Sequence, residues 1–175
     1  MRSRGTRTLV GLLGLVGLLG LLLAACGEPE PDLEAPTRAT GQHLLDEVGI
    51  VDEVVERRLV EVQGETGFDV VAVLYEDERA TLGQADRAGR ALLDAWDADI
   101  VLVAVAFPNH FTEEDPEARQ RFFGVTATDR FTVRRGLRER IVEDAVPAPA
   151  AENDWTAAFL AAIAELEVDL AAEGG

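Results

Sequence analysis

The chain has 175 residues, of which 33 are acidic and 16 are basic, so its formal net charge is −17. This negative charge argues against nucleic acid as a partner, because phosphate binding requires a basic surface. Every basic residue is arginine, which excludes reactions that depend on a Schiff-base or P-loop lysine. The only serine is Ser3, at the extreme N-terminus, and the only cysteine is Cys26.

The first 25 residues have the organisation of a secretory signal peptide. Arg2, Arg4 and Arg7 form a positive region, which is followed by the apolar run 9–23. The run ends in Leu23-Ala24-Ala25-Cys26, which resembles the cleavage motif of bacterial lipoproteins. In such proteins the cysteine carries a diacylglyceryl thioether and becomes the new N-terminus. We therefore predict a signal peptide over 1–25 and lipid attachment at Cys26.

Two other interpretations of this segment stay open. A conventional secretory signal would leave Cys26 as a free thiol. A membrane-spanning helix would need about 20 apolar residues, and the run 9–25 is shorter. The acidic, proline-containing stretch after Cys26 favours the lipoprotein. Acyl chains would then hold the protein at the bilayer, on the extracytoplasmic face of the cell membrane.

The mature chain is predicted to consist of a short tether and one domain. Cleavage before Cys26 would leave 13 basic and 33 acidic residues, a net charge of −20. Residues 26–42 contain several prolines and show no apolar periodicity, which is typical of a flexible tether. Residues 43–172 have the length and the apolar patterning of a single folded domain.

The first half of this domain predicts a strand–helix–strand unit. After a short apolar entry at 43–50, helical spacing of apolar residues begins behind Asp52 and ends at Gly64 or Gly67. The segments 68–75 and 100–107 are almost continuously apolar, as expected for strands covered on both faces. A helix over about 83–96 connects them, so we expect the two strands to be parallel.

The second half predicts one more strand and two helices. The segment 121–127 follows a connection too short for a crossover helix, so this strand is expected to run antiparallel to the second one. A helix around 133–141 should end before Pro147, and a last helix should begin after Asn153 or Asp154. The fold class is therefore α/β: a single three-layer α/β/α domain with a small, mostly parallel mixed sheet.

Four fragments carry recognisable local patterns. They are an acidic-glycine-hydrophobic turn at 46–50, a Thr-Gly pair before the valine-rich strand, and a helix ending in Trp96 before the next strand. The fourth is a closing pattern of a helical segment at 141–146, Pro147, Asp154-Trp155 in a small acidic loop, and an alanine-rich helix. In this order, over about 44–170, they resemble the TPM domain. This is an α/β module of bacterial envelope proteins and of a chloroplast protein involved in photosystem repair.

The chain also departs from that family. The glycine- and lysine-rich loop that usually follows the Trp is reduced to residues 97–99, and the Gly-aromatic-Gly-Leu-Glu motif after the third strand is missing. Some family members resemble metal-dependent acid phosphatases or calcium binders. Of the positions such an activity would use, only Asp46 matches.

Carboxylates follow the carboxyl ends of the predicted parallel strands, where open α/β sheets bind ligands. Glu76 and Asp77 come after the first of these strands, and Glu113 and Asp115 after the second. Together with Asp46 they are candidate ligands for Ca²⁺ or Mg²⁺, which bind about six oxygens. The alternative is that these residues form solvated acidic loops.

The remaining candidates are histidines and arginines. His43 and His110 are expected at the surface. Five arginines between 130 and 140 form a basic cluster that either pairs with acidic neighbours or docks a carboxylate- or phosphate-bearing partner.

These patterns lead to two hypotheses about function. The first is a lipid-anchored envelope lipoprotein whose domain acts as a binding or assembly module, with another envelope protein as its partner. The second is a divalent-metal-dependent acid phosphatase of the TPM type, which would use carboxylates to bind the ion and polarise water. A solute-binding lipoprotein is disfavoured, because one domain of this length lacks two lobes that close around a ligand.

Overall fold

A computed structural model describes residues 36–129, 131–133 and 135–173. The predicted signal peptide, its cleavage motif Leu23-Ala24-Ala25 and the lipid attachment site Cys26 lie outside the described residues. Within the described ranges, none of the helices combines the length and apolar character needed to cross a membrane.

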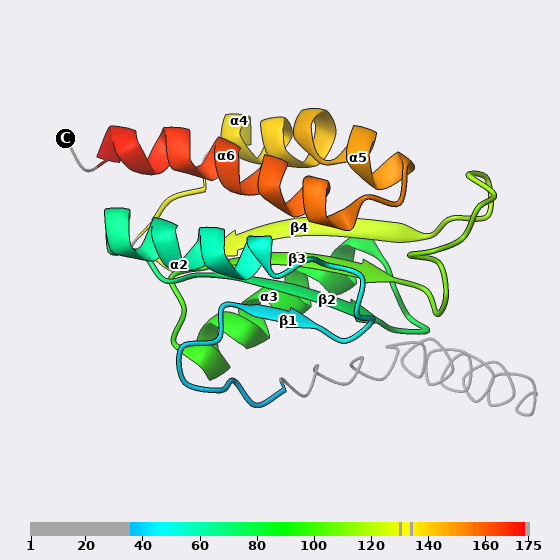
Figure 1. Cartoon of the computed structure of the whole chain (residues 1–175), viewed down its shortest axis with the longest axis horizontal. Coiled ribbons are helices and arrows are strands. Elements are labelled where there is room, and N and C mark those ends of the chain that lie inside the picture. Colours follow the sequence, from blue (N-terminus) through cyan, green and yellow to red (C-terminus); the bar gives the residue numbers. More distant parts are fainter. Residues whose placement is uncertain (1–35, 130, 134, 174–175) are drawn as a thin grey trace, which may run out of the picture. The chain divides into compact units, whose positions relative to one another are not determined.

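Four strands form one mixed sheet whose spatial order follows the sequence (Figure 1). Its strands are β1 (Leu44–Asp46), β2 (Val70–Glu76), β3 (Ile100–Ala106) and β4 (Arg121–Ala127). The first three run parallel, with Val70 opposite Ile100, whereas β4 runs antiparallel to β3. The predicted parallel pair and the antiparallel third strand are thus confirmed.

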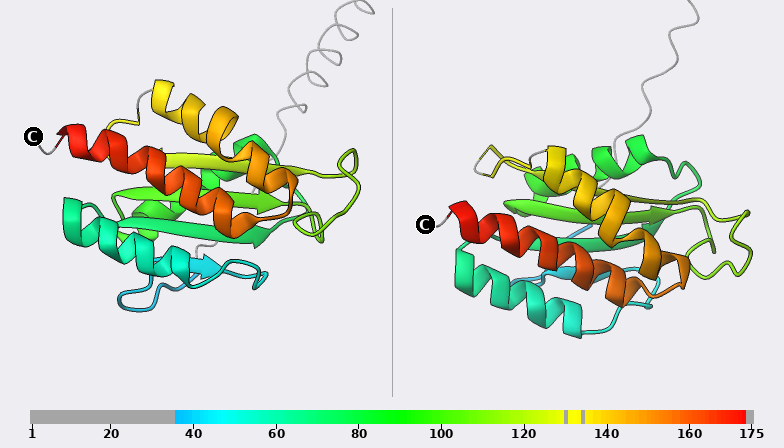
Figure 2. Two further views of the ribbon diagram at one scale, coloured as in Figure 1. Left: turned by 45° about the horizontal axis from the view of Figure 1, so that its top comes forward. Right: turned by 90° about the horizontal axis from the view of Figure 1, so that it is seen from above.

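Helices cover both faces of this sheet (Figures 1 and 2). The helix α3 (Leu82–Trp96) lies on one face and connects β2 to β3. The other face carries α2 (Val54–Thr66), α4 (Arg135–Glu139), the π-helix η1 (Arg140–Ala145), α5 (Pro147–Ala151) and α6 (Trp155–Glu173). The predicted three-layer α/β/α architecture is therefore confirmed.

The alternation of side chains along β2 and β3 divides the core into two parts. Val70, Ala72 and Leu74 pack with α2 and α6, whereas Val71 and Val73 pack against α3. All residues of β3 are buried. Because both faces of β2 and β3 are covered, these strands are apolar without interruption. This continuous apolar pattern made both strands predictable from the sequence.

Local chemistry sets the ends of the helices. Gly67 ends α2 with φ of 74°, a left-handed conformation that glycine adopts without steric cost. The side chain of Thr81 accepts a hydrogen bond from the backbone N–H of Gln84 at the start of α3. Asp154 accepts one from Ala157 in the first turn of α6, so Asp154 is the cap of the predicted last helix.

Two elements differ from the sequence-based expectations. The apolar entry at 43–50 contains the short strand β1, which pairs with β2. The preceding helix ends at Ala145, before Pro147 as expected, but Pro147 opens a further short helix, α5, at a position where a missing N–H costs nothing. Val146, between the two helices, has helical dihedral angles, and its N–H donates to the Ile141 carbonyl.

Glycine at position 89 allows α3 to pack closely on β4. A Cβ atom at Gly89 would lie 2.9 Å from the Cβ of Thr126, closer than packed side chains tolerate. We expect Gly89→Ala to lower the free energy of unfolding by about 1–3 kcal/mol, as overpacked substitutions do. Urea denaturation followed by circular dichroism measures this change.

The matched control is Gly64→Ala in the exposed part of α2, where an added Cβ meets no atom within 4 Å. This variant should be more stable by about 0.5–1 kcal/mol, because alanine favours the helix over the unfolded chain. Equal effects of the two substitutions would contradict the close contact between α3 and β4.

Candidate functional site

Asp46, the last residue of β1, holds the loop that follows it. Its carboxylate accepts four backbone hydrogen bonds: from Val48 at 3.0 Å, Gly49 at 2.8 Å, and Ile50 and Val51 at 2.6 Å each. We call residues 47–51 the Asp46 loop. Its tight path requires φ of +78° at Gly49. Both carboxylate oxygens are used in this way, so Asp46 acts as a clamp for the loop.

The other predicted metal ligands are also engaged locally. Glu76 accepts from the Asn109 N–H at 2.7 Å, and Glu113 accepts from the Asp115 N–H at 2.9 Å. Asp115 in turn accepts from the Glu117 N–H. Asp77 is bound by the guanidinium of Arg79, whose hydrogen bond lowers the pKa of that carboxyl group.

These carboxylates do not converge. Over the described ranges, no group of three or more His, Cys, Asp or Glu side chains could hold a metal ion. The expected gathering of Asp46, Glu76, Asp77, Glu113 and Asp115 around one ion is therefore not found, because turn amides and an arginine occupy the carboxylates instead. Phosphatase activity therefore stays a prediction. Within the described residues, no assembled set of metal ligands supports it.

The predictions for the two histidines and for the arginine cluster have different outcomes. His43 is buried, with 3% of its surface exposed, and its Nδ1 lies 3.2 Å from both the Val70 carbonyl and Asp69, so its prediction as a surface residue was wrong. His110 Nδ1 accepts from the Gln120 N–H.

The pairing predicted for the arginine cluster is confirmed for its described members, which bind Glu139, Asp86, Glu165 and Asp169. Arg130 and Arg134 lie outside the described residues.

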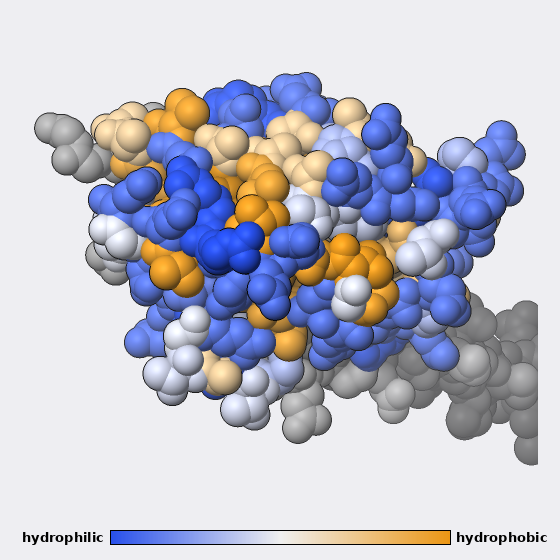
Figure 3. All heavy atoms as spheres, in the orientation of Figure 1, coloured by the Kyte–Doolittle hydropathy of each residue, from blue (hydrophilic) through white to orange (hydrophobic). Residues whose placement is uncertain are grey.

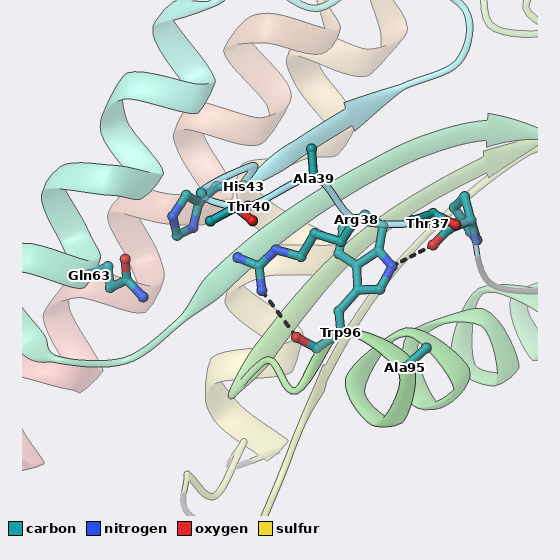
Figure 4. Close-up of a pocket in the computed structure, with 10 residues that line it drawn as sticks. Thr37, Arg38, Ala39, Thr40, His43, Gln63, Ala95 and Trp96 are labelled. Carbon is teal, nitrogen blue, oxygen red and sulfur yellow. Dashed lines mark hydrogen bonds between the residues drawn. The ribbon is translucent and has the colours of Figure 1, made fainter.

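A pocket of about 570 Å³ lies at the amino ends of the parallel strands (Figure 4). Its lining comprises residues 36–41 with His43, Gln63, Ala95 and Trp96. The Arg38 guanidinium donates to both oxygens of Asp69, at 2.5 and 2.9 Å, and to the Trp96 carbonyl at 3.2 Å. This hydrogen bond to Asp69 raises the pKa of Arg38.

The same contacts revise the boundary of the tether. The indole N–H of Trp96 donates to the Pro36 carbonyl at 2.7 Å, and Arg38 also binds the Gln42 carbonyl. Residues 36–42 were assigned to the flexible tether from their composition, but they contact the domain through these bonds. In the pocket that this segment lines, the side chains of Arg38 and His43 are already paired with groups of the domain. These contacts attach the segment 36–42 to the domain.

A smaller pocket of about 210 Å³ lies at the carboxyl ends of β1 and β2, next to α3. Its lining combines apolar side chains with carboxylates: Pro36, Leu45, Val73, Leu92 and Tyr75, with Glu47, Glu76 and Asp77. We call it the Tyr75 pocket.

Tyr75 distinguishes this pocket chemically. Only 6% of the residue is exposed, and its buried hydroxyl has no hydrogen-bond partner among the described residues. Burial raises the pKa of this phenol to about 12, and the negative charge of Asp77 acts in the same direction. The sequence pattern gives Tyr75 no functional role, because the residue lies in an apolar run that is typical of core. The available signal was that the only tyrosine directly precedes an acidic stretch.

No protein-family model matches the chain, and no curated protein matches it in sequence. The resemblance to the TPM domain therefore stays a hypothesis based on four fragments of the sequence. The fold and the sites define an architectural class. It is a three-layer α/β domain with a clamped loop and an acidic pocket at the carboxyl edge of its parallel strands.

The clamp formed by Asp46 makes a testable contribution to stability. Asp46→Ala removes the acceptor of four N–H groups, so the free energy of unfolding should fall by about 2–3 kcal/mol. Hydrogen exchange at Val48, Ile50 and Val51 should accelerate in the same variant. Glu47→Gln, an exposed neighbour, is the control and should change neither quantity. An unchanged exchange rate in Asp46→Ala would contradict the clamp.

The raised pKa of Tyr75 can be measured directly, because the chain contains one tyrosine. Phenolate absorbance of the native protein should titrate with a midpoint near pH 12, against about 10 in denaturant. The folded state favours the protonated phenol. Its contribution to stability is therefore complete below pH 10 and is lost as the pH rises towards 12. A native midpoint near 10, with circular dichroism unchanged, would contradict the burial of this hydroxyl.

Proposed function

We propose that this protein is a lipoprotein of the cell envelope, anchored through acyl chains on Cys26, whose α/β domain binds another envelope protein. The observation that carries the proposal is the motif Leu23-Ala24-Ala25-Cys26 at the end of an apolar run, with a folded domain close behind it. Two or more acyl chains suffice for stable attachment to a bilayer without a spanning helix.

The length of the tether supports a role near the membrane surface. Pro36, which already contacts Trp96, follows Cys26 by ten residues. An extended chain spans at most about 3.5 Å per residue, so the domain can move no further than about 35 Å from the anchored cysteine. A domain held this closely meets membrane-associated proteins in preference to soluble ones.

The Asp46 loop supports binding as the role of the domain. Val48, Ile50 and Val51 pack against the core yet remain partly exposed, and the clamp holds their backbone in one conformation. A loop that is already ordered loses little entropy on association. Figure 3 shows further hydrophobic surface interspersed with hydrophilic surface over the helical layer that contains α2 and α6.

One experiment tests both parts of the proposal. A photo-cross-linking amino acid replaces Ile50 in the Asp46 loop, and the chain is expressed in a bacterial host that processes lipoproteins. We expect the chain in the membrane fraction, labelled by palmitate, with a discrete cross-linked product to another envelope protein. Cys26→Ser should abolish the label and release the chain from the membrane.

The control for the binding role is the same cross-linker at Leu82, which is 51% exposed and lies on α3. It should give no discrete product, because a specific partner contacts one face. Equal products from both positions would reject the Asp46 loop as the binding surface. Membrane retention of Cys26→Ser would reject the lipid anchor.

A further inference from the structure

The ring of His43 has one nitrogen that the described part of the fold does not use. Only 3% of this residue is exposed, its backbone N–H donates to Glu56, and its carbonyl accepts from Ala72. Nδ1 lies 3.2 Å from both the Val70 carbonyl and the Asp69 carboxylate. Because both of these neighbours accept hydrogen bonds, Nδ1 carries the proton of the neutral ring and Nε2 carries a lone pair.

This Nε2 atom opens onto a pocket. It has no hydrogen bond or ion pair within the described residues. In the same part of the chain, the fully buried side-chain atoms without a partner are the hydroxyls of Tyr75 and Thr128. Nε2 is not one of them, so solvent reaches it from the pocket of about 570 Å³ that His43 lines. We call this space the His43 pocket.

Two further polar groups of the lining are also uncommitted. A guanidinium has five N–H donors, and Arg38 uses four of them in hydrogen bonds to the domain and to its own segment. The fifth, on Nη2, has no partner among the described residues. Gln63 on α2 is exposed, and its side-chain amide makes no hydrogen bond there either. In Figure 4, His43 lies between Arg38 and Gln63.

The charge of the His43 pocket argues against an ionic ligand. With His43 neutral, Arg38 is the one charged side chain of the lining, and both oxygens of Asp69 neutralise it. An anion would therefore find no free cation. A metal ion would find a single imidazole and no carboxylate or thiolate in the lining. The pocket thus suits a neutral ligand.

The hydrogen-bonding groups indicate which neutral ligand fits. Nε2 of His43 can only accept, the free N–H of Arg38 can only donate, and the amide of Gln63 does both. Hydroxyl groups match such a lining, because each one donates and accepts. A peptide group offers one donor and one acceptor on opposite sides, so it satisfies fewer of these groups. The volume lies within the usual range of roughly 300–1,000 Å³ for ligand sites.

We propose that the His43 pocket binds a neutral sugar. One hydroxyl of the sugar donates to His43 Nε2, and others exchange hydrogen bonds with Arg38 Nη2 and with the Gln63 amide. Ala39 and Ala95 supply apolar contact for the carbon atoms of the ring. The pocket lies at the amino ends of the parallel strands, whereas the Asp46 loop follows the carboxyl end of β1. The site is therefore independent of that loop and of the lipid anchor.

Nuclear magnetic resonance of the histidine rings tests the site in the full chain, held in a non-ionic detergent. The chain has two histidines, and His110 is an internal control, because its Nδ1 already accepts from the Gln120 N–H. The probes are glucose, galactose, mannose, N-acetylglucosamine and trehalose. We expect at least one of them to shift the ¹⁵N resonance of His43 Nε2 upfield, saturably, while the resonances of His110 stay unchanged.

Charged and peptide compounds are the matched controls. Glucosamine and glucuronate, which add one charge to a similar ring, should bind at least about tenfold more weakly than the best neutral sugar. No response of His43 to any neutral sugar would overturn the proposal and leave water as the occupant. A response to N-acetylalanine amide alone would overturn it in favour of a peptide, and equal shifts of His43 and His110 would show non-specific binding.

Substitutions on α2 identify the binding surface without disturbing the buried His43. Gln63→Ala should weaken binding of the best sugar about fivefold, the usual effect of losing one hydrogen bond. Val60→Ala, at a 47% exposed position of α2 outside the pocket lining, should leave the affinity unchanged. Melting temperatures of both variants should stay close to that of the parent chain. Equal affinities of all three proteins would reject this pocket as the sugar site.

Discussion

The burial of β2 and β3 on both faces is the constraint on which the rest of the structure depends. Every residue of β3 lacks solvent exposure, and alternate residues of β2 face two separate parts of the core. Such strands are stable only if helices cover both sides of the sheet. The chain meets this requirement with α3 on one face and with α2, α6 and the shorter helices on the other.

Arginine links these layers in a chain that has no lysine. Arg121, at the start of β4, donates to the carbonyls of His110, Glu113 and Ala150 and to the Asn153 side chain. Its planar group thereby joins the loop after β3 to the turn before α6. Arg138 binds Asp86 on α3, and Arg140 binds two carboxylates of α6. The forked guanidinium suits such multiple contacts, which a lysine could not replace.

Function is inferred from the carboxyl edge of the parallel strands, where two features arise from one strand pair. The last residue of β1, Asp46, orders a loop with partly exposed apolar side chains, and the end of β2 leaves the Tyr75 hydroxyl buried beside an acidic pocket. The first feature suits a protein surface. With a lipid anchor at Cys26, it would operate within a short distance of the membrane.

Sequence alone determined the parallel strands, the antiparallel return of β4 and the three layers, because continuous apolar runs and helical spacing reflect burial directly. It also supplied the membrane hypothesis, which rests on local chemistry around Cys26. The structure decided the roles of Asp46, His43 and Tyr75. A carboxylate looks the same in sequence whether it binds metal or backbone amides, and a tyrosine in an apolar run looks like core. Only the positions of their neighbours in space distinguish these cases.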